Sequence, residues 1–169
     1  MSNVRPLNTV STLHRAELEV FADYHQFYVQ DGEVFPDAPT EWSDADVKRR
    51  VKVAENVVVV CPVRNMHVPV EIEVLTSEPS FDLADFDHVA RCSLALPSGR
   101  LQVHECTGGE RLSLSVAPGT YSVLALFSQL GSLSDDGLEG NDRYRVVLWP
   151  GVGTALSIVK AWPGEEAHS

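Results

Sequence analysis

The sequence lacks any long apolar run. Residues 1–20 contain no apolar stretch of the kind that follows the charged start of a secretory signal. No later segment approaches the roughly 20 consecutive apolar residues that a membrane-spanning helix needs. We therefore expect a cytoplasmic protein that makes no contact with a membrane.

The chain also lacks a linker rich in proline, glycine or serine that would separate two halves. Its 169 residues are enough to bury one sizeable hydrophobic core. We expect a single domain spanning residues 1–169, in which residues 1–16 and 163–169 form poorly ordered ends.

Cysteine is scarce and histidine is dispersed. Cys61, Cys92 and Cys106 are odd in number and form no CxxC pair, so each is expected to behave as a small hydrophobic residue. The six histidines are scattered along the chain, although strand pairing could bring two or three of them together. The sequence therefore predicts no disulfide bond, no bound metal and no cofactor.

Positive charge is in short supply. Thirteen lysines and arginines face 24 aspartates and glutamates, which gives a formal net charge of -11. Nucleic acids and anionic membranes are bound chiefly through Lys and Arg, so this balance argues against direct nucleic-acid binding. The acidity either serves solubility or attracts a basic protein partner.

Catalytic signatures are missing as well. The sequence has no GxSxG elbow, no phosphate-binding glycine loop and no HExxH motif, and we predict a protein that is not an enzyme. The acidic run at residues 134–142 does not have the spacing of a calcium-binding loop. It is predicted to be a flexible loop before a strand that begins near Tyr144.

A period of two residues dominates what remains. Residues 68–74 alternate apolar and polar side chains, as in a strand with one buried face, whereas the four valines at 57–60 predict a strand buried on both faces. Parity predicts a hairpin turn at Ser98 and Gly99. Pro118 and Gly119 predict either a second hairpin or a corner between sheets.

Helix signals are limited to residues 43–51, where Ser43 is a plausible N-cap and Asp46 completes an acidic capping box. Many short strands without alternating long helices are typical of an antiparallel architecture. The fold class is therefore predicted as all-β, with one short helix, in an antiparallel sandwich or an open barrel.

Residues 19–47 place aromatic side chains among carboxylates. If residues 23–30 form a strand, two interpretations are open. In one, Phe27 and Val29 pack inward as core residues; in the other, aromatic side chains of the segment anchor a partner. The candidate partner-binding residues are Tyr24, His25, Tyr28, Asp31 and Trp42 from this segment, and Asp135, Asp136, Glu139 and Asp142 from the acidic loop.

Four stretches resemble a known family. Residues 24–27 read Tyr-His-Gln-Phe, and residues 42–47 read Trp-Ser-Asp-Ala-Asp-Val. Together with residues 116–121 and 142–144, they resemble, in the same order, motifs of the competence protein J family. The resemblance implies an acidic, non-enzymatic cytoplasmic protein that binds and inhibits a basic partner, a nuclease that acts in DNA uptake. The alternative is a β-sandwich that binds a small ligand or carries an unrecognised active site, with His25, His67 or His104 gathered beside carboxylates in a pocket.

Overall fold

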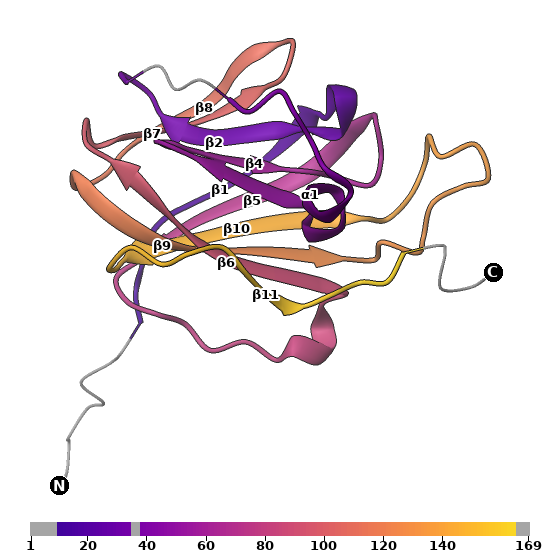
Figure 1. Cartoon of the computed structure of the whole chain (residues 1–169). Helices are drawn as coiled ribbons and strands as arrows, with labels where there is room; N and C mark the ends of the chain where they lie inside the picture. The colour runs from indigo at the N-terminus through magenta and orange to yellow at the C-terminus, as the bar shows by residue number, and fades with distance from the viewer. Residues whose placement is uncertain (1–9, 35–37, 165–169) are drawn as a thin grey trace, which may run out of the picture.

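Two β-sheets packed face to face form the architecture (Figure 1). The computed structural model describes residues 10–34 and 38–164. One sheet has six strands, in the order β1 (Thr12–Phe21), β5 (His67–Leu75), β10 (Arg143–Pro150), β9 (Gly119–Ser128), β6 (His88–Leu96) and β11 (Ser157–Lys160). Its pairs are antiparallel except for β5 and β10, which run parallel.

The second sheet has five antiparallel strands, in the order β3 (Val51–Ala54), β4 (Val57–Val60), β2 (Phe27–Asp31), β7 (Arg100–Glu105) and β8 (Gly109–Ser115). The two sheets form separate layers and do not close into a barrel. The prediction of an all-β, mainly antiparallel fold is confirmed, and of the two predicted architectures, sandwich and open barrel, the chain adopts the sandwich.

The core lies between the sheets and follows the alternation of the strands. Phe27, Val29 and Val58 from the five-stranded sheet pack in one cluster with residues such as Ile72 and Phe127 from the six-stranded sheet. The whole of β4 is buried, as the sequence predicts.

Both sheets are also covered on their outer faces. In β4, Val59 pairs with Lys52, whose Nζ donates a hydrogen bond to the Glu41 carbonyl of the segment before the helix (2.6 Å). On the six-stranded sheet, Phe81 and Phe86 of the β5–β6 connection pack on a second apolar cluster. In the five-stranded sheet, one face of β4 lies against the core and the other lies towards the segment before the helix, so valines on both faces are buried.

The helix α1 (Asp44–Arg49) confirms the short helix predicted near residues 43–51. The Asp46 N–H donates to Ser43 Oγ (3.1 Å), and the Ser43 N–H donates to Asp46 Oδ2 (2.9 Å), which completes the capping box. Hydrogen bonds from the Lys52 ammonium and the Ser43 N–H lower the pKa of Asp46 to about 2. The helix ends where Arg50 adopts a left-handed conformation.

The predicted hairpin at Ser98 and Gly99 is wrong, because β6 and β7 belong to different sheets. The turn is a corner, and the buried Asp31 carboxylate holds it by accepting hydrogen bonds from the Ser98 N–H (2.9 Å) and hydroxyl (2.8 Å). The turn at Pro118 and Gly119 is also a corner between sheets, which was one of its two predicted forms.

The ends of the chain differ in part from the expectation. Residues 12–16 were predicted to be poorly ordered, but they belong to β1 and pair with β5. Pro163 and Gly164 lie in neither a helix nor a strand. The rest of the two predicted ends, residues 1–9 and 165–169, lies outside the described residues.

A buried polar network joins two loops at one end of the sandwich. The Tyr144 hydroxyl donates to Asp142 Oδ2 (2.6 Å) and accepts a hydrogen bond from the Val63 N–H (2.9 Å). Arg64 Nε donates to Asp142 Oδ1 (2.9 Å), and its Nη1 donates to the Leu138 carbonyl (3.3 Å). The network therefore ties the β4–β5 loop to the acidic loop between β9 and β10.

Tyr144→Phe removes the hydroxyl at the centre of this network and is expected to lower the free energy of unfolding by about 1–3 kcal/mol. The physical reason is that buried groups that lose a hydrogen-bond partner retain their desolvation cost. Urea denaturation followed by circular dichroism measures the change. Tyr24→Phe is the control, because its exposed ring should change stability by less than about 0.5 kcal/mol. Equal stability of the two variants would contradict the role of the network.

Candidate functional site

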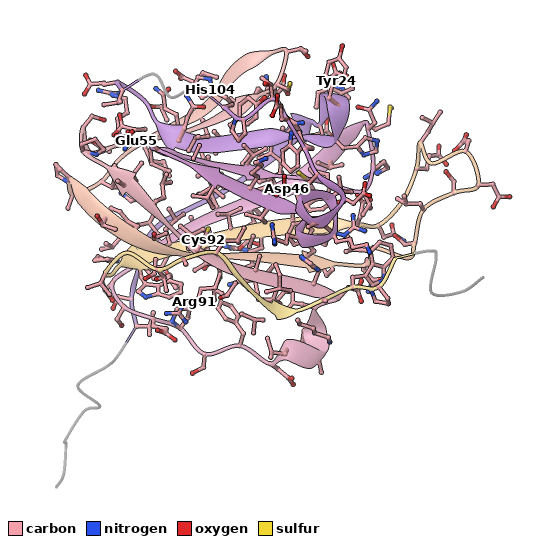
Figure 2. All side chains as sticks on the ribbon, in the orientation of Figure 1. Tyr24, Asp46, Glu55, Arg91, Cys92 and His104 are labelled. Atoms are coloured by element: carbon pink, nitrogen blue, oxygen red, sulfur yellow. The ribbon has the colours of Figure 1, made fainter. Side chains whose placement is uncertain are left out.

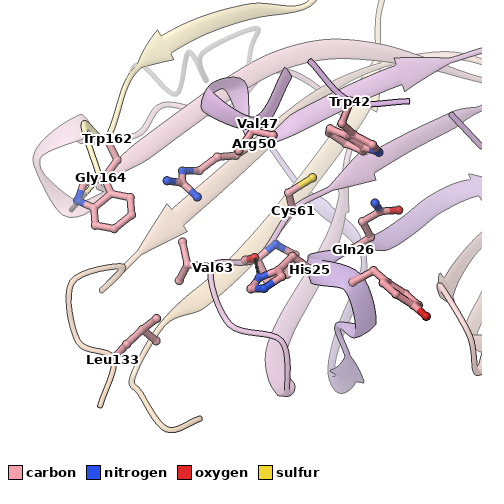
Figure 3. A pocket seen from close by; sticks show the side chains of 12 residues that line it. His25, Gln26, Trp42, Val47, Arg50, Cys61, Val63, Leu133, Trp162 and Gly164 are labelled. Atoms are coloured by element: carbon pink, nitrogen blue, oxygen red, sulfur yellow. Dashed lines mark hydrogen bonds between the residues drawn. The ribbon is translucent and has the colours of Figure 1, made fainter. Parts of the chain in front are cut away.

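A cavity of about 680 Å³ opens at the end of the sandwich where this network lies (Figure 3). Five segments that are distant in sequence supply its walls: residues 24–26, Trp42 with the C-terminal half of α1, the β4–β5 loop, the acidic loop, and the chain after β11. The volume falls within the range of about 300–1,000 Å³ typical of ligand pockets.

Tyr24 and His25 lie in a short 3-10 turn, η1 (Asp23–His25), and not in the strand considered for residues 23–30. Both residues have positive φ angles, 57° and 56°, which are uncommon for residues other than glycine. The Thr107 hydroxyl donates to Asp23 Oδ2 (2.9 Å), and His25 Nδ1 donates to the Pro62 carbonyl (3.1 Å). These contacts hold a turn from which Tyr24 projects outward, 68% exposed (Figure 2).

The opposite wall depends on His88, which is fully buried. The Trp162 N–H donates to His88 Nδ1 (3.1 Å), so Nε2 carries the hydrogen that is donated to the Arg49 carbonyl (2.7 Å). The Arg50 guanidinium lies over the Trp162 ring, 4.8 Å from its centroid. One neutral imidazole therefore fastens the chain after β11 to the end of α1 and positions a cation–aromatic pair at the cavity.

Trp42 and Cys61, both half-buried, also line the cavity. Lys52 Nζ lies 5.5 Å from the centroid of the Trp42 ring, and the buried Trp42 Nε1 has no acceptor among the described residues. Burial raises the pKa of the Cys61 thiol to about 12, so the thiol is protonated at neutral pH. None of the described lining residues carries a carboxylate. The lining is suited to burying apolar groups.

The acidic loop contributes Leu133 to the cavity wall and presents Asp135, Asp136 and Glu139 to solvent. Within the loop, the Ser134 hydroxyl donates to Asp136 Oδ1 (2.6 Å) and the Ser134 N–H donates to the Glu139 carbonyl (2.8 Å). Hydrogen bonds from Ser134 and from the Leu138 N–H lower the pKa of Asp136. The loop thus displays negative charge beside an apolar cavity.

Three of the predicted partner-binding residues lie elsewhere. Asp31 and Asp142 have no exposed surface, and both carboxylates are occupied by internal hydrogen bonds. Burial of Asp31 opposes its ionisation, but hydrogen bonds from Ser98, Val34 and Glu33 outweigh burial and lower its pKa. Tyr28 is half-buried, and its hydroxyl donates to Gln26 Oε1 and contacts Cys106 Sγ, both at 3.2 Å. In this structure Asp31 and Asp142 hold the fold, and their side chains are inaccessible to a partner.

The cavity includes residues that the sequence analysis missed, notably Val47, Arg50, Leu133 and Trp162. Of these four, Val47 alone could have been identified from the local sequence, because it is an apolar residue among charged neighbours on a short predicted helix. In the structure it is 54% exposed. The other three come together through tertiary structure.

The histidines considered for an active site do not gather at the cavity. His25 lines it, whereas His67 lies beside Glu19 with Nδ1 3.7 Å from Oε1, and His104 Nε2 bonds Gln102 Oε1 (2.8 Å). Across residues 10–34 and 38–164, no three His, Cys, Asp or Glu side chains are placed to hold a metal ion. Nor does that part of the chain contain a helix long and apolar enough to cross a membrane.

Two solved structures share this fold. ComJ from Bacillus subtilis, described as an inhibitor of the DNA-degrading activity of NucA, superposes with a TM-score of 0.64 at 15% sequence identity. The product of crocagin biosynthetic gene J superposes with a TM-score of 0.52 at 20% identity. Each match covers 85% of this chain and 99% of the other.

No protein-family model matches the sequence, and a comparison with curated proteins finds no match. At these identities the structural matches establish a common fold. The resemblance to competence protein J noted in the sequence is therefore confirmed as a distant relationship in fold.

The pH dependence of stability tests the role of His88. Burial lowers the pKa of the folded His88, whereas the unfolded residue takes up a proton near its ordinary value of 6.5. Its contribution to stability is therefore complete above pH 6.5 and decreases as the pH falls below that value, by at most about 1.4 kcal/mol per pH unit. Urea denaturation at pH 7.5 and 5.5 should show that His88→Gln loses less stability on acidification than the parent.

His67→Gln is the matched control, because the exposed His67 side chain should leave the pH dependence close to that of the parent. A His88→Gln variant with the full pH dependence of the parent would show that His88 is not held neutral by the fold.

Proposed function

We propose that this protein is a non-catalytic binding module that inhibits a nuclease by occupying the basic groove that binds DNA. The observation that carries the proposal is the fold shared with ComJ over 99% of that chain, since ComJ is an inhibitor of a DNA-degrading activity. In this proposal the protein acts in the cytoplasm on a basic protein partner, and it binds neither nucleic acid nor a membrane.

Electrostatics supports such a partner. A nuclease attracts the phosphate backbone with positive charge, and a protein with a formal net charge of -11 is attracted by the same field. Complementary charge raises the rate of encounter and excludes partners with the wrong sign. The exposed acids of residues 135–139 are the part of the acidic loop best placed to make such contacts.

The position of aromatic side chains supports short-range contacts in addition to this long-range attraction. Tyr24 and Trp42 line the same cavity as Leu133 of the acidic loop, so aromatic surface and negative charge meet at one end of the molecule. Aromatic side chains contribute large buried areas and dominate binding hot spots. We place the partner-binding surface at this end of the sandwich.

Capture followed by an activity assay tests the proposal. Proteins from the native host that bind the immobilised protein at low salt are identified, and any nuclease among them is produced separately. Its degradation of plasmid DNA is then measured while the protein is added up to a molar excess. Loss of activity near equal molar amounts is the expected result. A captured nuclease that stays fully active, or the absence of any captured nuclease, would overturn the proposal.

The acidic loop is expected to govern association. The combined variant Asp135→Asn, Asp136→Asn and Glu139→Gln removes three charges but keeps oxygen acceptors for the loop hydrogen bonds. Its association rate with the nuclease should fall roughly tenfold at low salt, and the rate should depend less on ionic strength. Stopped-flow or surface plasmon resonance measurements at several salt concentrations provide the rates.

Tyr24→Ala should shorten the lifetime of the complex and leave the association rate almost unchanged. The binding free energy should weaken by about 2 kcal/mol. Leu13→Ala, which truncates an exposed apolar residue on β1, is the control for this variant.

The acidic-loop variant has its own contradicting outcome. If its association rate at low salt equals that of the parent, the loop is a solvated turn without a role in binding.

A further inference from the structure

The cavity is unusual for an acidic protein because its lining is largely apolar and includes an arginine but no carboxylate among the described residues. Aromatic and aliphatic side chains from separate segments form the interior, and Arg50 is the charged residue among them. Asp23 precedes Tyr24 in the η1 turn, and Asp135, Asp136 and Glu139 follow Leu133 in the acidic loop. These acids therefore adjoin lining residues in the sequence, while none of the described lining residues carries a carboxylate.

Apolar surface remains open at the rim of the cavity. Tyr24 is 68% exposed and Val47 is 54% exposed, and both line the cavity. Large exposed apolar residues that gather around a concavity and are bordered by polar groups mark sites of interaction. The rim is therefore suited to receiving a side chain that buries this surface.

The Arg50–Trp162 pair favours a flat side chain. A guanidinium held over an indole ring presents flat surfaces, on which a further aromatic ring can stack. A volume of about 680 Å³ accepts a whole aromatic side chain with part of its flanking backbone. Acids beside the opening would then face the residues on either side of the aromatic one.

We propose that the cavity is a socket for one aromatic side chain of the protein partner, and that this side chain is flanked by lysine or arginine residues that pair with the acidic rim. The basic character of the partner rests on the proposed function. The socket is the anchoring site of that interaction, and the acidic loop is its source of long-range attraction.

Two labelled peptides test the socket directly: acetylated, amidated Lys-Arg-Phe-Lys-Arg and the same peptide with alanine in place of phenylalanine. Fluorescence anisotropy at low salt measures their dissociation constants for the full-length protein. The phenylalanine peptide should bind at least about tenfold more tightly, as expected when an aromatic side chain is buried. Equal affinities would overturn the proposal.

Val47→Glu separates the socket from general charge attraction. The substitution places a carboxylate at the rim, so both peptides gain electrostatic attraction. The ratio of the dissociation constants of the alanine and phenylalanine peptides should fall towards one. Val159→Glu adds the same charge at a valine of similar exposure, 45%, on β11, and should keep the tenfold ratio. An unchanged ratio in Val47→Glu would show that the aromatic side chain binds elsewhere.

A third probe, neutral N-acetyl-phenylalaninamide, distinguishes a protein anchor from a small ligand. Binding as tight as that of the basic peptide would overturn the proposal, because the acidic rim would then contribute nothing. The nuclease assay keeps the two proposals apart. If the protein distinguishes the two peptides but inhibits no nuclease, the proposed function is wrong and the socket stands. If it inhibits a nuclease but binds both peptides equally, the socket is wrong and the proposed function stands.

Discussion

The Asp142 carboxylate lies between the Arg64 guanidinium and the Tyr144 hydroxyl without exposure to solvent, and the end of the sandwich that holds the cavity depends on this arrangement. A charge buried in this way is stable only while its partners surround it. Because Arg64 also bonds the Leu138 carbonyl, the position of the acidic loop follows from that of the β4–β5 loop. Two segments far apart in sequence thus reach the same site in a defined orientation.

Much of the fold could be predicted because alternation is a local signal. The valines of β4, the faces of β6 and β7, and the capping box of α1 all follow from residues close in sequence. The Ser98 corner could not be recognised, because a hairpin and a corner give the same parity of buried residues. The distinction depends on Asp31, which lies 67 positions away and binds the turn.

The site was less predictable for a related reason. Tyr24, His25 and Trp42 stood out as polar-tipped or aromatic residues among acids, and they do line the cavity. Trp162 carries no local mark of its role, since it reaches the cavity through a hydrogen bond to His88, 74 positions away. Asp142 shows the converse: in sequence a buried carboxylate looks the same as an exposed one, and only its contacts reveal which it is.

The parallel pairing of β10 with β5 sets the order in which the molecule can be completed during synthesis. β10 lies between β5 and β9, so it is the strand that joins the β1–β5 pair to the strands on its other side. Until Arg143–Pro150 leaves the ribosome, β5 has an unpaired edge, and the six-stranded sheet exists as two separate pieces. Such non-local pairing is slow to form, and it leaves nascent chains exposed to aggregation for longer than hairpin-connected strands do.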